Sequence, residues 1–201
     1  YIPGVAKQWA TDPKDSRITY LRLDPDARWS DGLPVTVDDI FFSLYFYLSP
    51  HIKSPSLNRV YDDQFQTVTR YDDRTFSIKD KKSSPEPLSL IAGFPLVQRE
   101  FYRAFGEDYI DRYHWQFSPV TGAYTLNPEK VEKGRHVTMD RLENWWGDTK
   151  KFYKNRHNPD HIRYSLMRDD SKAFEAFLRG DFDWHNLNRT DLWHERANAK
   201  P

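Results

Sequence analysis

The 201-residue chain contains no cysteine and has no net charge, and each absence excludes a class of function. Without cysteine there is no disulfide, no thiolate nucleophile and no cysteine-ligated metal. The 30 Lys and Arg residues balance 30 Asp and Glu residues. Nucleic-acid binders normally carry a basic excess, because phosphate neutralisation supplies much of their affinity. We therefore expect no nucleic-acid partner.

Long hydrophobic runs and aliphatic side chains are also scarce. No run approaches the ~18 apolar residues of a membrane-spanning helix, and residues 1–6 lack the pattern of a signal peptide. Hydrophobic residues make up 38% of the chain. Aromatic residues compensate at 16%, since each buried ring removes about 150–250 Å² from water. We interpret the chain as a piece of a longer protein, whose signal peptide would lie outside it.

Local patterns predict an α+β fold with mixed sheets and flanking helices. A helix begins at Thr36, because Thr36 and Asp39 form a capping-box pattern and apolar residues follow at helical spacing through Leu48. Ser49-Pro50 ends that helix. A β-hairpin is predicted for 65–79, with its turn at 72–74.

The rest of the chain is predicted with the same rules. The expected elements are strands at 17–23, 122–126, 136–142 and 161–167, helices at 96–105 and from 169–171 to Gly180, a loop at 51–58, a turn at Asn127-Pro128 and an extended segment at 181–184. A boundary between two parts of the chain is expected near 108–118.

Four blocks of sequence resemble one known family, in that family's order. Residues 28–40 (RWSDGLPVTVDDI) resemble the W-S-D-G-x-P-V-T-A-x-D-V signature of the family 5 extracellular solute-binding proteins. The other blocks are 119–124 (PVTGAY, with Ala123 where proline is usual), 141–147 (RLENWWG), and 162–164 (IRY) with 173–177 (AFEAF) and 180–183 (GDFD). Around 134–135 and 162–168 the chain is most similar to the branch that handles oligopeptides and peptide-like antibiotics such as microcin C.

The resemblance implies a periplasmic-binding-protein-like fold of type II (cluster C), of which this chain would form one incomplete lobe. Residues 1–110 would be the small subdomain of the first lobe, and 111–201 the segment that returns to the main lobe and leads to the hinge. It implies a receptor of an ABC importer that closes two lobes on a peptide or peptide-like solute. The location would be periplasmic or lipid-anchored at the cell surface, with permease subunits as partners and no cofactor.

The expected ligand contacts are Trp184, His185 and Asn186, which follow the last block where the chain would cross toward the second lobe. A ring, an imidazole and an amide can stack on and hydrogen-bond a peptide. The alternative, that Trp184 packs under the hinge, stays open. Weaker candidates are Tyr45, Tyr47 and Tyr61.

Other motifs favour structural roles. The 29–32 loop reads as a core tryptophan followed by a turn, and one ring of Trp145-Trp146 is expected in the core. His157 and His161 flank Pro159, which argues against a helical zinc site. The Asp pairs at 38/39, 62/63, 72/73 and 169/170 lie at predicted helix starts or turns.

Two rival functions remain at this point. One is the sensor domain of a transcription regulator with the same fold. The other is a carbohydrate hydrolase that uses the tryptophans and carboxylates such as Asp31 and Asp183.

Overall fold

The computed structural model describes residues 2–52, 54–188, 190–192 and 194. We call residues 2–118 the N-terminal region and 119–188 the C-terminal region. The first contains β1 (Ala6–Thr11), β2 (Ile18–Leu23), α1 (Val37–Leu48), α2 (Pro55–Gln64), β3 (Phe65–Arg70), β4 (Thr75–Asp80), α3 (Leu88–Ala92) and α4 (Tyr109–Tyr113). The second contains β5 (Tyr124–Glu132), β6 (His136–Arg141), β7 (His161–Ser165) and α5 (Asp170–Leu178), and α6 (Thr190–Leu192) follows it.

The N-terminal region is built on a four-stranded antiparallel sheet with the order β1-β2-β4-β3. Leu21 pairs with Phe76 and Thr19 pairs with Ile78. Because side chains alternate along a strand, this register puts these four residues on one face. The prediction of a strand at 17–23 and a hairpin at 65–79 is confirmed.

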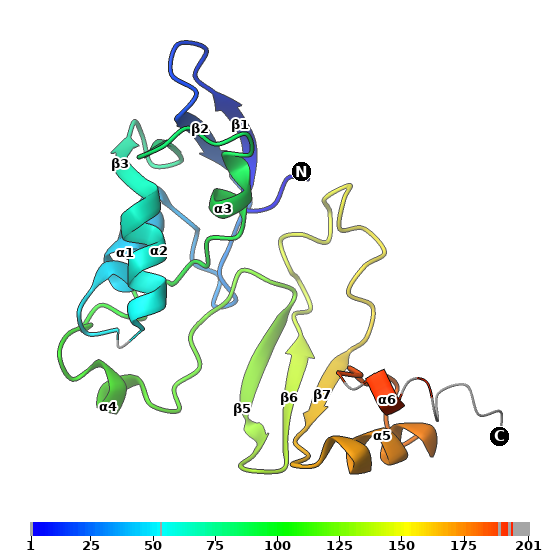
Figure 1. Cartoon of the computed structure of the whole chain (residues 1–201). Helices are drawn as coiled ribbons and strands as arrows, with labels where there is room; N and C mark the ends of the chain where they lie inside the picture. The colour runs from blue at the N-terminus through cyan, green and yellow to red at the C-terminus, as the bar shows by residue number, and fades with distance from the viewer. Residues whose placement is uncertain (1, 53, 189, 193, 195–201) are drawn as a thin grey trace.

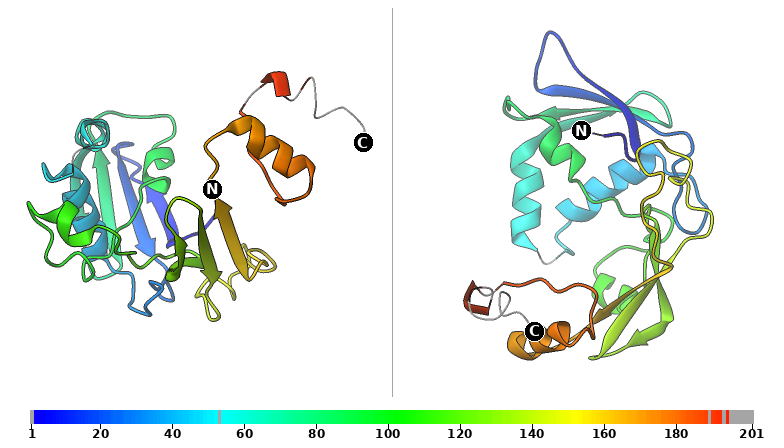
Figure 2. Two further views of the ribbon diagram at one scale, coloured as in Figure 1. Left: turned by 90° about the horizontal axis from the view of Figure 1, so that it is seen from below. Right: turned by 90° about the vertical axis from the view of Figure 1, so that its right-hand side faces the viewer.

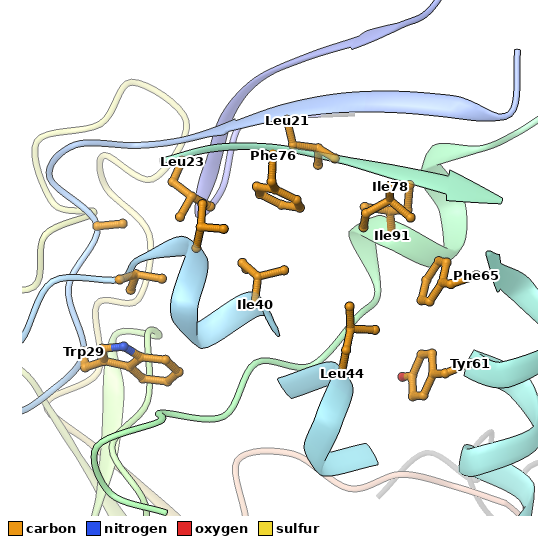
Figure 3. Close-up of a cluster of buried hydrophobic side chains, with 13 residues drawn as sticks. Leu21, Leu23, Trp29, Ile40, Leu44, Tyr61, Phe65, Phe76, Ile78 and Ile91 are labelled. Carbon is orange, nitrogen blue, oxygen red and sulfur yellow. The ribbon is translucent and has the colours of Figure 1, made fainter. Parts of the chain in front are cut away.

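That face of the sheet packs on α1 and α2 and forms the main hydrophobic core. Figure 3 shows Phe76 and Ile78 on the strand side of the cluster and Ile40 and Leu44 on the α1 side, with Tyr61 of α2 beside them. The cluster consists of Leu21, Leu23, Ala27, Trp29, Val35, Val37, Ile40, Leu44, Tyr61, Phe65, Phe76, Ile78 and Ile91.

Asp39 connects the start of α1 to two other parts of the region. Its Oδ2 accepts hydrogen bonds from the Thr36 backbone N–H at 2.9 Å and from Trp29 Nε1 at 3.3 Å. Its Oδ1 accepts one from the Arg99 backbone N–H at 3.0 Å. The predicted helix start and the core role of Trp29, which is 3% exposed, are confirmed.

The C-terminal region holds a three-stranded antiparallel sheet with the order β5-β6-β7. None of the residues in these three strands is fully buried. Helices α5 and α6 follow β7 and lie beyond the β7 edge of this sheet, which is the edge farther from α1 and α2 (Figures 1 and 2). Among the described helices, none combines the length and apolar character that crossing a bilayer requires.

The connection between β6 and β7 joins the two regions. Lys150 Nζ lies 2.8 Å from Asp24 Oδ1 and 2.7 Å from Asp26 Oδ2. Burial disfavours the charged form of Lys150, but the two carboxylates outweigh it and raise the pKa of Lys150. Asp24 is 5% exposed, so this ammonium neutralises a carboxylate that has little contact with water.

The indoles of Trp145 and Trp146 both bind the segment with which the C-terminal region begins. Trp145 Nε1 and Trp146 Nε1 donate to one acceptor, the backbone oxygen of Thr121, at 2.8 and 2.9 Å. Trp145 is buried, as expected for one of the two rings, and Trp146 packs against the main core. A Cβ at Gly147 would overlap the Trp145 ring, so glycine is needed at that position.

The predicted helix at 96–105 is wrong. Helix α3 ends at Ala92, before this stretch, residues 94–98 are not helical, and residues 99–104 form turns. The backbone N–H of Val97 donates to Ser43 Oγ at 2.9 Å, and that of Arg99 donates to Asp39. These tertiary hydrogen bonds to α1 hold the segment in a nonhelical path.

Two further predictions are corrected. The loop predicted at 51–58 contains the start of α2, because Pro55 occupies a first-turn position, where its missing N–H costs nothing. The turn predicted at Asn127-Pro128 is an irregularity within β5, and the chain reverses instead near Gly134, whose φ is +78°.

Two differences concern strands. Segment 181–188, predicted to begin as an extended segment, contains no strand, and β1 was not among the predicted elements.

Candidate functional site

A cavity of about 790 Å³ lies beside β7, and we call it the β7 cavity. Its walls come from β7, the start of α5 and the segment that follows α5. The lining residues are Pro159, His161, Ile162, Arg163, Tyr164, Ser165, Met167, Asp170, Ala173, Asp181, Phe182, Asp183, Trp184, His185 and Asn186. All five residues of β7 take part, and β7 is an edge strand of its sheet.

The two ends of α5 place the chain around this cavity. Asp169 caps the start, since its Oδ1 accepts a hydrogen bond from the Lys172 backbone N–H at 2.9 Å. Gly180 ends the helix with φ +83°, a conformation that glycine adopts without strain. The chain turns there, and residues 181–186 contribute to the wall of the cavity together with β7.

Trp184, His185 and Asn186 all line the β7 cavity. Trp184 is 72% exposed, so its indole is available for contact. The His185 imidazole lies 6.1 Å from the Phe174 ring and 6.0 Å from the Phe177 ring, measured between centroids. The three predicted residues are thus brought together, with His185 held against α5 and Trp184 free of the core.

The cavity wall carries charge of both signs. Asp170, Asp181 and Asp183 contribute carboxylates, and Arg163 contributes a guanidinium. Asp181 accepts from Arg179 Nη2 at 2.8 Å. A wall of this kind can bind an ammonium group and a carboxylate at separate points while rings contact the apolar part of the ligand.

Three large apolar side chains in the wall of this cavity are exposed: Tyr164, Met167 and Trp184. Exposed apolar side chains gathered at a cavity are typical of a binding site. Sequence reasoning missed Tyr164 as a site residue, although its place in the block 162–164, next to Arg163, could have indicated it.

The weaker tyrosine candidates have three different surroundings. Tyr61 is buried in the main core. Tyr45 is exposed, and its ring centroid lies 5.9 Å from that of Phe105. Tyr47 lines a separate cavity of about 480 Å³ next to α4, which we call the ring cavity.

His157 and His161, the two histidines considered as metal ligands, contact different groups. The His157 ring lies 5.2 Å from the Trp145 ring, whereas His161 Nδ1 lies 2.8 Å from Asp140 Oδ1. The Lys130 ammonium, together with His161, lowers the pKa of Asp140. In the described part of the chain, no group of three or more His, Asp and Glu side chains could hold a metal ion.

The aspartates considered for hydrolysis do not line a common cavity. Asp31 Oδ1 accepts from the Leu33 backbone N–H at 3.1 Å, and its Oδ2 accepts from Gln98 Nε2 at 2.8 Å. Asp183 lines the β7 cavity, and Asp31 is not among the residues of that wall. Asp31 therefore stabilises its own turn.

Comparison with known proteins agrees with this fold. The Agrobacterium fabrum protein described as "Probable peptide-binding protein YejA" is 26% identical over 193 residues, covering 94% of this chain and 31% of the relative. A Thermotoga maritima periplasmic oligopeptide-binding protein with bound mannohexaose matches with a TM-score of 0.74 and 19% identity, covering 96% of this chain and 35% of that one. The Bacillus subtilis oligopeptide-binding protein AppA, in complex with a nonapeptide, has a TM-score of 0.75 and 14% identity, with coverage of 95% and 36%.

The chain therefore spans about a third of the length of these proteins. The solved structures show the fold alone at such low identity. Residues 1–200 match the family described as "Bacterial extracellular solute-binding proteins, family 5 Middle". The chain belongs to this family of solute-binding proteins.

Proposed function

We propose that this chain is part of the substrate-binding component of an ABC importer and that the component binds peptides or peptide-like solutes. The observation that carries the proposal is the β7 cavity. There an exposed indole, an imidazole and an amide share a wall with carboxylates and a guanidinium. The peptide-binding description of one relative and the nonapeptide bound to a structural neighbour support this ligand class.

In the proposed mechanism, an extended ligand lies along β7. An edge strand has backbone N–H and C=O groups that can pair with an extended peptide. Trp184 stacks on a side chain, Asn186 hydrogen-bonds the peptide backbone, and His185 is held by α5 to do the same. Asp183 or Asp170 binds the ligand's ammonium group. The component performs no covalent chemistry.

The division of the chain follows from the same proposal. Residues 1–110 form the small subdomain of the first lobe, and 111–201 form the segment that returns to the main lobe and leads to the hinge. A second lobe, provided by the rest of a longer protein, would close over the β7 cavity. The component would act in the periplasm or at the cell surface and deliver its ligand to permease subunits.

Isothermal titration calorimetry of the full-length protein tests the proposal. The titrants are tri- to pentapeptides, with mannohexaose and a nickel–histidine complex as alternative ligands. We expect a peptide to bind, and we expect Trp184→Ala to weaken that binding about tenfold or more, which corresponds to at least ~1.4 kcal/mol. Binding of sugar or nickel complex with no response to any peptide would refute the ligand class.

Trp115→Ala is the matched control. Trp115 is also an exposed tryptophan, but it is not among the residues that line the β7 cavity. Lys133 Nζ lies 4.2 Å from the centroid of the Trp115 ring. Peptide affinity should stay within twofold of the parent protein. An equal loss in both variants would mean that Trp184 has no specific role.

A further inference from the structure

The ring cavity differs from the β7 cavity in the chemistry of its wall. Its wall is formed by residues at the end of α1, by residues 51, 52 and 54, and by α4 with the residues before and after it. Its lining residues are Phe46, Tyr47, His51, Ile52, Ser54, Leu96, Val97, Tyr102, Tyr109, Ile110 and Ser118. This described wall includes no Asp, Glu, Lys or Arg.

The rings of this wall are held edge to face around Phe46. The Phe46 ring centroid lies 5.3 Å from that of Tyr47, at an interplanar angle of 84°. It lies 5.3 Å from that of Tyr109, also at 84°, and 5.0 Å from that of Tyr102. Edge-to-face packing is one of the arrangements that aromatic rings prefer, so these contacts fix the positions of Tyr47 and Tyr109 in the wall.

The hydroxyl groups in the wall stay uncharged at neutral pH. Burial, followed by the neighbouring tyrosines, raises the pKa of Tyr47 to about 12. Burial also raises the pKa of Tyr102 and that of Tyr109. A cationic ligand group would lose its hydration here without gaining a carboxylate partner, whereas an uncharged ring would lose little.

Access to the cavity is open at α4. Ile110 is 49% exposed and lines the cavity, so an apolar side chain stands at its edge in contact with water. The volume of about 480 Å³ exceeds what a single phenol or phenyl ring requires. Size, neutrality and ring geometry therefore favour the same kind of occupant.

We propose that the ring cavity is a second binding site, distinct from the β7 cavity, for an uncharged aromatic ring such as that of a tyrosine or phenylalanine residue. The site goes beyond the proposed function, because it needs neither Trp184 nor a peptide in the β7 cavity. A ring entering it would contact the half-buried Tyr47 and Tyr109 and the exposed Ile110, with the buried Phe46 holding the two tyrosines in place.

The experiment uses the full-length protein and three small probes. They are N-acetyl-L-tyrosinamide, p-cresol and N-acetyl-L-lysinamide, each followed by saturation-transfer NMR and by calorimetric titration. We expect N-acetyl-L-tyrosinamide to bind with a Kd on the order of 1 mM and the lysine derivative at least tenfold more weakly. If p-cresol also binds, the site recognises the aromatic ring alone. If p-cresol does not bind while N-acetyl-L-tyrosinamide does, the site recognises the ring together with the amide groups.

Two exposed apolar residues provide a matched pair of variants. Ile110→Arg places a charge at the edge of the ring cavity and should weaken N-acetyl-L-tyrosinamide binding about tenfold. Val60→Arg makes the same change at an exposed position of α2 that lies outside the cavity wall, and it should leave the Kd within twofold. Trp184→Ala should also leave it within twofold.

Equal binding of the tyrosine and lysine derivatives, or unchanged binding in Ile110→Arg, would overturn the second site. Neither result bears on peptide binding in the β7 cavity, which is measured separately with Trp184→Ala. Conversely, ring binding that persists while every peptide fails would overturn the proposed function and leave the second site standing.

Discussion

The two regions of the molecule differ in how deeply their sheets are buried. The N-terminal region packs a four-stranded sheet on α1 and α2 around the main hydrophobic core. The C-terminal region has a three-stranded sheet with no fully buried strand residue, and it exposes large apolar side chains around the β7 cavity. Stability should therefore come mainly from the first region, and ligand contact from the second.

This contrast also separates two roles of tryptophan. Trp29 is enclosed by the N-terminal core and donates to Asp39, whereas Trp184 projects from segment 181–186. Burial decides which free energy each ring affects. A buried ring contributes to folding, and an exposed ring at a cavity contributes to binding.

Trp29→Ala should produce the largest loss of stability. Removing a buried aromatic ring leaves a cavity, and such changes cost about 3–5 kcal/mol of unfolding free energy. It also removes the hydrogen bond that Trp29 Nε1 donates to Oδ2 of the buried Asp39. Urea denaturation measures the effect.

The comparison is sharpened by Trp184→Ala, which should change the unfolding free energy by less than about 0.5 kcal/mol. Similar losses in the two variants would contradict the division of roles between the regions.

Lys150→Met should have the next largest effect, because it breaks the ionic contact between the regions. The buried carboxylate of Asp24 would lose the ammonium 2.8 Å away and keep the hydrogen bond from the Asp26 backbone N–H, and a hydrogen bond to a charged group contributes about 1.5–3 kcal/mol. Chemical denaturation should show this loss. The neighbouring Lys151→Met, at an exposed position, should be nearly neutral, and a loss of the same size there would argue against the joint.

Asp80→Asn should raise stability slightly at neutral pH. Both carboxylate oxygens of Asp80 are buried without a hydrogen-bond partner among the described residues. Burial raises the pKa of Asp80, and the nearby Gln64 amide, outside hydrogen-bond geometry, offsets only part of that. At pH 7 the ionised carboxylate opposes folding, so the amide should add up to about 1 kcal/mol.

The pH dependence fixes the sign of this effect. A carboxyl whose pKa is raised on folding favours the folded state below its unfolded pKa, near 3.9, and loses that contribution as pH rises. The advantage of Asp80→Asn should therefore shrink as pH falls from 7 toward 4. Asp72, whose pKa is lowered by hydrogen bonds from Arg74 and Thr75, should show the opposite sign when changed to Asn. A constant advantage at every pH would exclude a charge effect at Asp80.

Much of the fold could be predicted where local signals agree with tertiary contacts. The sequence predicts the helix start at Thr36 and Asp39 and the helix end at Gly180, because each of these motifs satisfies the backbone groups at a helix end locally. The path of residues 96–105 could not be predicted, since it depends on hydrogen bonds from Val97 and Arg99 to α1 residues distant in sequence. Pro55 indicated a loop although it begins a helix.

The candidate site shows the same limit. Trp184, His185 and Asn186 are consecutive, so one motif could indicate all three. The rings of Phe46, Tyr102 and Tyr109 come from separate segments and become one wall only when α4 packs near the end of α1. Their spacing in sequence contains no sign of a cavity.

The Thr121 carbonyl has a consequence for how forces pass through the molecule. An amide oxygen has two lone pairs, and here each one is taken by an indole. Releasing that oxygen would strand two tryptophan donors at once, so the Trp145-Trp146 turn and the Thr121 backbone should separate as a single event and not bond by bond. The two indoles and this carbonyl therefore form one rigid unit at the beginning of the C-terminal region.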